Sequence, residues 1–121
     1  MRVLVVEDEV RLAATLQDLL ELNGYTVDVC HDGEAGLDNA LTSIYDVILL
    51  DVMLPKLDGF GVCELIRRQS RVPIVLLTAL DGEAEQLRGF DLEIDDYITK
   101  PFSMPILLRK LAAVLRRAGG D

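Results

Sequence analysis

Acidic, hydroxyl and amino side chains follow four short apolar runs of the sequence. Glu7-Asp8-Glu9 follows the first run, Asp51 follows Val47 to Leu50, and Thr78 and Lys100 each follow a later run. Carboxylates that gather in a cleft repel one another and attract a hard divalent cation, for which oxygen ligands favour Mg²⁺. An aspartate can also attack a phosphoryl group as a nucleophile, if cations and donors neutralise the phosphoryl oxygens. These residue types therefore suit Mg²⁺-dependent phosphorylation of Asp51, with Lys100 and Thr78 assisting.

Each of these residues alone also has an ordinary explanation. Asp8 could cap a helix, Thr78 could simply end a strand, and Lys100 could be a solvated surface lysine. Their combination indicates a binding site, because ligands of an open parallel sheet bind beyond the carboxyl ends of its strands. We therefore favour one shared site.

The elements that would position these residues are short strands alternating with amphipathic helices. Strands are expected over 2–6, 25–30, 47–50, 74–77 and 97–98, and helices over 10–22, 33–41, 59–68, 82–92 and 105–117. Asn23-Gly24 should end the first helix, while Asp58 and Ser103 are the expected N-caps of the third and last helices. The expected helix over 82–92 has the weakest pattern.

Strict alternation of this kind predicts an α/β fold, a five-stranded parallel sheet with helices on both faces. The run Val47 to Leu50 lacks polar alternation, as expected of a central strand covered on both sides. The 121 residues fit one domain over 1–118, and Gly119-Gly120-Asp121 has the composition of the start of a linker.

The composition also indicates which kinds of partner and which cellular location to expect. With 21 acids, 12 Lys and Arg and a net charge of −9, this segment is not expected to bind nucleic acid directly. No apolar run is long enough for a membrane span and no signal peptide is recognisable, so we expect a cytoplasmic protein. The two cysteines, Cys30 and Cys63, are expected to be buried free thiols. The single histidine, His31, is expected in a surface loop rather than in a metal or phosphorelay role.

With these residues in view, the chain closely resembles the receiver domains of bacterial response regulators, the partners of sensor histidine kinases. The matching motifs cover the whole chain: Val5-Val6-Glu7-Asp8-Glu9, Leu50-Asp51-Val52-Met53-Leu54-Pro55 with Asp58-Gly59-Phe60, Leu77-Thr78-Ala79, and Asp95-Asp96-Tyr97-Ile98-Thr99-Lys100-Pro101-Phe102. This resemblance implies a CheY-like, flavodoxin-like (βα)5 order of the elements. The segment around Tyr97 and the closing Val114-Leu115-Arg116-Arg117 resemble the OmpR/PhoB-type subfamily, whose members usually carry a winged-helix DNA-binding domain downstream.

The resemblance also implies roles for individual residues. Asp51 would be the phosphoacceptor, and Glu7 and Asp8 would hold Mg²⁺ together with Asp51 and the main-chain carbonyl of Met53. Lys100 would pair with the phosphoryl group.

Thr78 and Tyr97 would form the switch pair that responds to phosphorylation. The Lys100-Pro101 peptide bond would be cis, as it is in the family. Phosphorylation would promote a homodimer through a face formed by the fourth helix, fifth strand and fifth helix. The residues expected on this dimer face are Arg88, Asp95, Asp96, Ile106, Lys110 and Arg117.

Two departures from the family pattern affect this region. Glu93 and Ile94 stand where the family usually has Gly-Ala, so the preceding helix lacks its easy left-handed stop. Ile106 and Lys110 replace a usual Glu and Arg, which puts the usual set of dimer salt bridges in doubt.

The leading prediction is a phosphorylation-controlled receiver of a two-component system, with a transcriptional output through a C-terminal DNA-binding domain that this chain lacks. The alternative is a stand-alone receiver that acts through a partner protein. A third reading, a dehalogenase-like phosphatase, requires an acid two residues after the nucleophile, where this chain has Met53. We therefore expect a signalling switch and not an enzyme.

Overall fold

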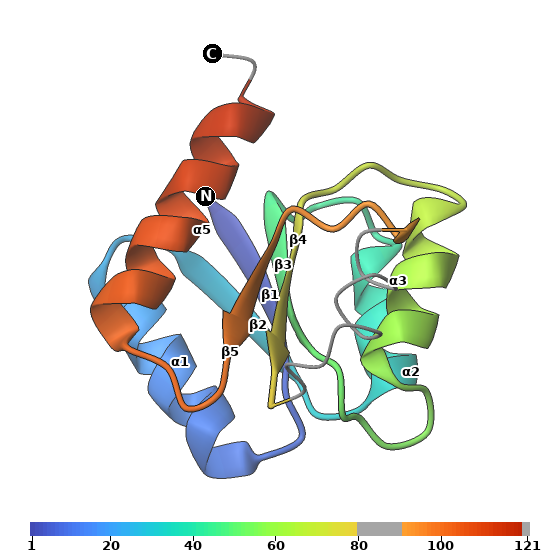
Figure 1. Cartoon of the computed structure of the whole chain (residues 1–121), viewed down its shortest axis with the longest axis horizontal. Coiled ribbons are helices and arrows are strands. Elements are labelled where there is room, and N and C mark those ends of the chain that lie inside the picture. Colours follow the sequence, from blue (N-terminus) through green and yellow to red (C-terminus); the bar gives the residue numbers. More distant parts are fainter. Residues whose placement is uncertain (80–90, 120–121) are drawn as a thin grey trace.

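The computed structural model describes residues 1–79 and 91–119, which form a five-stranded parallel sheet with helices on both faces (Figure 1). The strand order is β2-β1-β3-β4-β5, so that β3 lies at the centre, between β1 and β4. The strands are β1 (Arg2–Val6), β2 (Thr26–Cys30), β3 (Val47–Asp51), β4 (Ile74–Thr78) and β5 (Asp96–Thr99). The helices are α1 (Val10–Leu22), α2 (Gly33–Ala40), α3 (Gly59–Arg67) and α5 (Met104–Ala118). The α/β class and the parallel sheet expected from the sequence are confirmed.

Helix ends agree with the expected capping residues. Helix α1 ends directly before Asn23-Gly24. The carboxylate of Asp58 accepts a hydrogen bond from the Gly61 amide at the start of α3, and the Ser103 hydroxyl accepts one from the Ile106 amide at the start of α5. Strand β1 and helix α1 have the expected bounds, and the ends of the other described elements lie within one residue of expectation. Both β5 and α5 extend one residue further at each end. The expected helix over 82–92 falls mainly on residues 80–90, which lie outside the described part of the chain.

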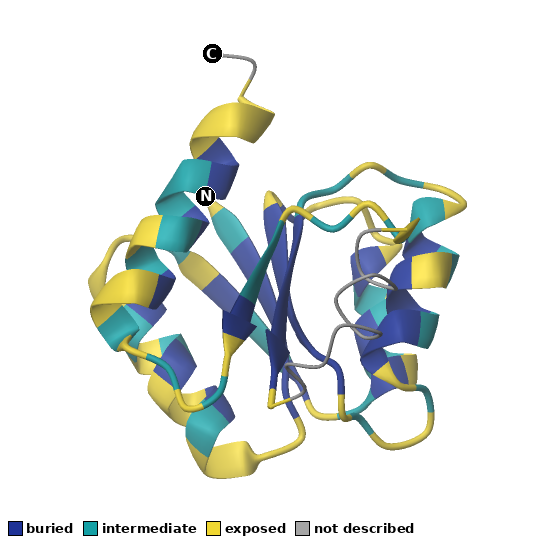
Figure 2. Ribbon diagram, viewed as in Figure 1, coloured by how far each residue is buried: buried dark blue, intermediate teal, exposed yellow. Residues whose placement is uncertain are grey.

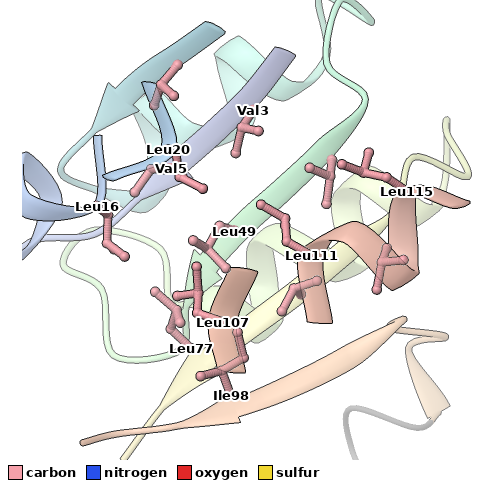
Figure 3. Close-up of a cluster of buried hydrophobic side chains, with 14 residues drawn as sticks. Val3, Val5, Leu16, Leu20, Leu49, Leu77, Ile98, Leu107, Leu111 and Leu115 are labelled. Atoms are coloured by element: carbon pink, nitrogen blue, oxygen red, sulfur yellow. The ribbon is translucent and has the colours of Figure 1, made fainter. Parts of the chain in front are cut away.

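The two faces of the sheet carry separate cores because successive residues of a strand point to opposite sides. Val3, Val5 and Leu49 face α1 and α5, and these side chains interdigitate with leucines of both helices (Figure 3). Leu4 and Leu50 face α2 and α3 instead. Strands β3 and β4 are buried throughout, whereas the outer surfaces of the helices are exposed (Figure 2).

Within residues 1–79 and 91–119, no helix combines the length and apolar character of a membrane span. Both cysteines are buried and free, as expected. Burial raises the pKa of the Cys63 thiol to about 11, so this thiol is protonated at neutral pH.

Candidate functional site

Three acids meet where β1 and β3 end. Asp51 is the last residue of β3 and only 3% exposed, and Glu7 directly follows β1 and is completely buried. Asp8 lies beside them and is exposed to solvent. The ligating oxygens of the three carboxylates lie within 4.8 Å of one another. The parallel order of neighbouring strands brings these acids together, as the sequence pattern predicted.

Lys100, the residue directly after β5, contacts two of these acids. Its ammonium Nζ lies 2.6 Å from Oε1 of Glu7 and 3.0 Å from Oδ2 of Asp51. The side chain is only 20% exposed, so both ion pairs are largely shielded from water. A shielded lysine between two carboxylates partly neutralises the negative charge at the end of β3.

The remaining oxygens of these two carboxylates accept hydrogen bonds from the backbone. Oδ1 of Asp51 accepts one from the amide of Met53 at 3.1 Å, and Oε2 of Glu7 accepts one from the amide of Glu9 at 2.9 Å. Each carboxylate is therefore held at one oxygen by Lys100 and at the other by the loop that follows its own strand. This double anchoring fixes the directions of both groups.

Burial and hydrogen bonding shift the pKa values of Glu7 and Lys100 in opposite directions. Burial raises the pKa of Glu7, although the hydrogen bonds from Lys100 and the Glu9 amide oppose that rise. Burial would lower the pKa of Lys100, but its hydrogen bonds to Glu7 and Asp51 outweigh burial, so this pKa is raised. Lys100 therefore stays cationic at neutral pH.

The oxygen atoms of Glu7, Asp8 and Asp51 fit a hard divalent cation. Carboxylates suit Mg²⁺, whereas softer metals prefer thiolate or imidazole ligands. Met53, whose main-chain carbonyl was expected to complete the ligand set, follows in the same loop and has a side chain that is 61% exposed. The three carboxylates therefore suit the expected Mg²⁺ site, and the Met53 carbonyl stays a predicted ligand.

Gly59 allows helix α3 to begin directly against the end of β3. Its amide donates a hydrogen bond to the carbonyl of Val52 at 2.8 Å, and a Cβ at this position would collide with the carbonyl oxygen of Asp51. Sequence reasoning assigned no role to this glycine. The available signal was its place immediately after the N-cap Asp58, where the chain has to turn sharply back toward the strand.

The two residues of the expected switch lie on neighbouring strands. Thr78 ends β4 and is 1% exposed, and its carbonyl accepts a hydrogen bond from the amide of Lys100 at 2.7 Å. Tyr97 on β5 is half-buried against the core on the α2 and α3 side of the sheet. The Lys100-Pro101 bond is cis, as the resemblance implied.

Residues of the expected dimer face already have partners within the chain. Lys110 Nζ lies 3.5 Å from Oδ1 of Asp96 and donates to the carbonyl of Tyr97 at 2.8 Å. Asp95 instead accepts a hydrogen bond from the amide of Ile74 at 2.8 Å, and its carboxylate lies 3.5 Å from Arg67.

The remaining residues expected on the dimer face are Ile106, Arg117 and Arg88. Ile106 is 53% exposed on α5 and Arg117 lies exposed near the end of that helix. Arg88 lies outside the described residues. The structure thus brings Asp96 and Lys110 together, but it pairs Asp95 with α3.

Glu93, which stands where the family usually has glycine, takes up the backbone conformation that glycine would have. Glu93 adopts a φ of +58°, the left-handed conformation for which glycine is usual. The guanidinium of Arg67 donates to the Glu93 carbonyl at 3.0 and 3.3 Å, which holds the backbone in this turn. The left-handed stop that glycine normally supplies is therefore present without a glycine.

Comparison with known proteins agrees with this geometry. The family model for the response regulator receiver domain matches residues 3–112. "Probable transcriptional regulator ycf27" of Guillardia theta is 46% identical over 116 residues, which is 96% of this chain and 46% of that protein. Response regulator ArlR of Staphylococcus aureus is 44% identical over 116 residues, 96% of this chain and 53% of that protein.

A solved structure is also similar over nearly the whole chain. The beryllofluoride-activated N-terminal receiver domain of RstA from Klebsiella pneumoniae has a TM-score of 0.90 and 31% identity, covering 96% of this chain and 99% of that one. The present chain belongs to the response regulator receiver domain family. It spans about half the length of the two curated relatives.

Proposed function

We propose that Asp51 accepts a phosphoryl group from a sensor histidine kinase and that the phosphorylated domain switches a transcriptional output. The observation that carries this proposal is the placement of Lys100 between Glu7 and Asp51, at 2.6 and 3.0 Å, beside a third carboxylate. A buried nucleophile next to a fixed cation suits phosphoryl transfer, which depends mainly on positioning and charge neutralisation.

The chemical step needs one nucleophile and one leaving group. A carboxylate oxygen of Asp51 attacks the phosphorus of a phosphohistidine, and the bond between phosphorus and the imidazole nitrogen breaks. Its electron pair leaves with the imidazole, and Asp51 becomes an acyl phosphate. Lys100 stabilises negative charge on the transferred group.

Glu7, Asp8, Asp51 and the main-chain carbonyl of Met53 would hold Mg²⁺. When bound, this ion supplies positive charge for the phosphoryl oxygens. Without the ion, one lysine faces three carboxylates and an incoming dianion, so Mg²⁺ should be required for phosphorylation.

Output would begin at Thr78 and Tyr97. In this proposal the Thr78 hydroxyl moves toward the phosphoryl group, and the Tyr97 ring moves inward. A change of this kind is a two-state element biased by a local charge. The half-buried Tyr97, packed against the core, is consistent with a ring that has a second buried position.

The response regulator that contains this domain would act in the cytoplasm as a transcription factor. Support comes from the curated relatives, which are about twice as long as this chain and one of which is named a transcriptional regulator. A net charge of −9 opposes direct DNA contact by this segment, so DNA would be bound by a separate C-terminal domain.

Incubation with a small phosphodonor tests the proposal. Wild-type protein should retain a stoichiometric, acid-labile phosphoryl group with Mg²⁺ and none with EDTA, and Asp8→Ala should be labelled far more slowly. Parallel incubation with a generic phosphate ester separates a switch from a phosphatase. Continuous turnover of the ester, or labelling that is indifferent to EDTA, would contradict the proposal.

A further inference from the structure

The turn that leads from β2 into α2, residues His31 to Gly33 with Gly33 as the first helical residue, touches both loops that carry the proposed metal ligands. His31 contacts the loop after β1, and Asp32 and Gly33 contact the loop after β3. The turn itself contains none of the proposed ligands. Because it contacts both ligand-bearing loops, the turn can fix the distance between them.

The His31 contact reaches a proposed ligand directly. Nδ1 of the imidazole lies 2.9 Å from the main-chain carbonyl oxygen of Glu7. A carbonyl oxygen only accepts hydrogen bonds, so Nδ1 carries the proton and donates. The Glu7 amide in turn donates to the carbonyl of Cys30 at 2.9 Å, which extends the β1–β2 pairing to the residue before His31. The backbone of Glu7 is therefore held by Cys30 at its amide and by His31 at its carbonyl.

The opposite side of the turn is packed against the loop that follows Asp51. The amide of Gly33 donates to the carbonyl of Pro55 at 3.2 Å, and a Cβ at Gly33 would collide with the backbone of Leu57. Asp32 caps α2 and its second carboxylate oxygen lies 3.7 Å from Nζ of Lys56. Close packing against the loop after β3 thus holds Asp32 and Gly33 in place, and this fixes the backbone from which the His31 side chain extends.

We propose that His31 is a positioning residue for the divalent-cation site, acting through its hydrogen bond to the Glu7 carbonyl. This inference rests on the proposed function, because it concerns the same Mg²⁺ site. Groups that orient metal ligands from outside the ligand set affect metal affinity as well as stability. Loss of the bond frees the Glu7 carbonyl while the Glu7 amide stays bonded to Cys30, so the peptide that leads to Asp8 no longer keeps one orientation relative to Asp51.

Calorimetric titration of the unphosphorylated domain with Mg²⁺ alone, at one fixed pH, tests this role. His31→Phe keeps a planar ring but has no donor, and its Mg²⁺ affinity should fall by about three- to tenfold, the size of one lost hydrogen bond. His31→Asn places an amide donor at nearly the position of Nδ1 and should bind Mg²⁺ within about twofold of wild type, within the same hydrogen-bond range. Asn23→Ala, which removes a hydrogen bond to Leu19 at the far end of α1, is the control for a general loss of stability.

The outcomes separate the two proposals. If wild type does not bind Mg²⁺, the proposed function fails. If wild type binds Mg²⁺ and His31→Phe binds it equally well, the positioning role is overturned while the metal site stands. Equal losses in His31→Phe and His31→Asn would also overturn it, because the donor would then not be what matters.

Discussion

The ammonium of Lys100 binds the carboxylate of Glu7 across 93 positions of the sequence, at 2.6 Å. Glu7 is completely buried, so it depends on this cation for its charge to be tolerated. The same lysine also reaches Asp51, so that one side chain contacts both the buried acid and the proposed phosphoacceptor.

Lys100→Gln should therefore destabilise the domain strongly in the absence of Mg²⁺. Removing one partner of a buried ion pair costs about 3–5 kcal/mol because it leaves an uncompensated charge. Urea denaturation in EDTA measures this loss. Lys110→Gln is the matched control: its partner Asp96 is 34% exposed, so that pair contributes at most about 1 kcal/mol. Equal losses in the two variants would show that Lys100 has no special part in stabilising Glu7.

Glu93→Gly should stabilise the domain. Glu93 occupies the left-handed region at φ +58°, which costs a residue with a Cβ about 1–2 kcal/mol. Glycine removes that cost but loses the exposed ion pair with Arg71 and adds entropy to the unfolded chain. We expect a net gain of about 0.5–1 kcal/mol in the free energy of unfolding.

Glu93→Ala is the control for this substitution. It loses the same ion pair but keeps a Cβ in the left-handed turn, so it should be no more stable than wild type. If alanine stabilises the domain as much as glycine does, the effect comes from removing the carboxylate and not from the backbone.

Tyr45 should make the stability depend on alkaline pH. Burial, together with the hydrogen bond that its hydroxyl donates to Asp28 at 2.8 Å, raises the pKa of Tyr45 to about 12. Because the unfolded chain loses this proton nearer pH 10, the contribution of Tyr45 is complete below about pH 10 and is lost as pH rises through about 12. Other groups that titrate there are common to wild type and Tyr45→Phe, so the comparison isolates Tyr45.

The stability difference between wild type and Tyr45→Phe is the quantity to measure. It should be about 1–3 kcal/mol near neutral pH, the usual loss for a buried hydrogen bond. It should shrink by about 1 kcal/mol by pH 11, since one pH unit of differential protonation corresponds to 1.36 kcal/mol. A difference that stays constant over this interval would mean that Tyr45 titrates normally in the folded state.

Much of this site could be predicted from the sequence because it depends on strand order. Asp51, Thr78 and Lys100 all follow apolar runs, and a parallel sheet brings such positions to one edge. The bond from Lys100 to Glu7 could not be predicted from the residues, because several acids were equally available and the choice depends on side-chain reach. The His31 contact was missed for a similar reason: a lone histidine in a turn carries no sign of which carbonyl faces it. At Glu93, the missing glycine suggested that a left-handed turn would be lacking, yet Glu93 itself adopts one. The partner that holds this turn, Arg67, lies in α3 and could not be identified from the sequence.

Phosphorylation should promote a two-fold dimer through the dimer face, with Ile106 contributing apolar surface. Ile106 is 53% exposed and stands where the family pattern would give Arg88 an acidic partner. One exposed ion pair contributes only about 0–1 kcal/mol. Because buried apolar surface contributes about 25 cal/mol per Å², burial of Ile106 at the interface can offset the loss of that ion pair, and the dimer need not be weaker. Asp96 and Lys110, which pair within the chain, would have to exchange partners or keep this pair at the interface.

Sedimentation of the beryllofluoride-activated domain at low and high salt measures this assembly. Wild type should dimerise with little dependence on salt, and Ile106→Glu should dimerise more weakly or only at low salt. Activated wild type that stays monomeric at high micromolar concentration would contradict the dimer. Tighter assembly of Ile106→Glu at low salt would mean that the missing ion pair outweighs the apolar contact.

Locating the phosphoryl group on the chain tests directly whether Asp51 is the phosphoacceptor. Wild-type protein, Asp51→Asn and Asp58→Asn are treated with a small phosphodonor and Mg²⁺, the acyl phosphate is trapped by borohydride reduction, and the modified peptide is identified by mass spectrometry. Asp58 is a suitable control because it lies seven residues away and only caps α3. Modification should occur at Asp51 alone in wild type and in Asp58→Asn, and nowhere in Asp51→Asn. Normal labelling of Asp51→Asn, or modification at any other acid of wild type, would contradict this assignment.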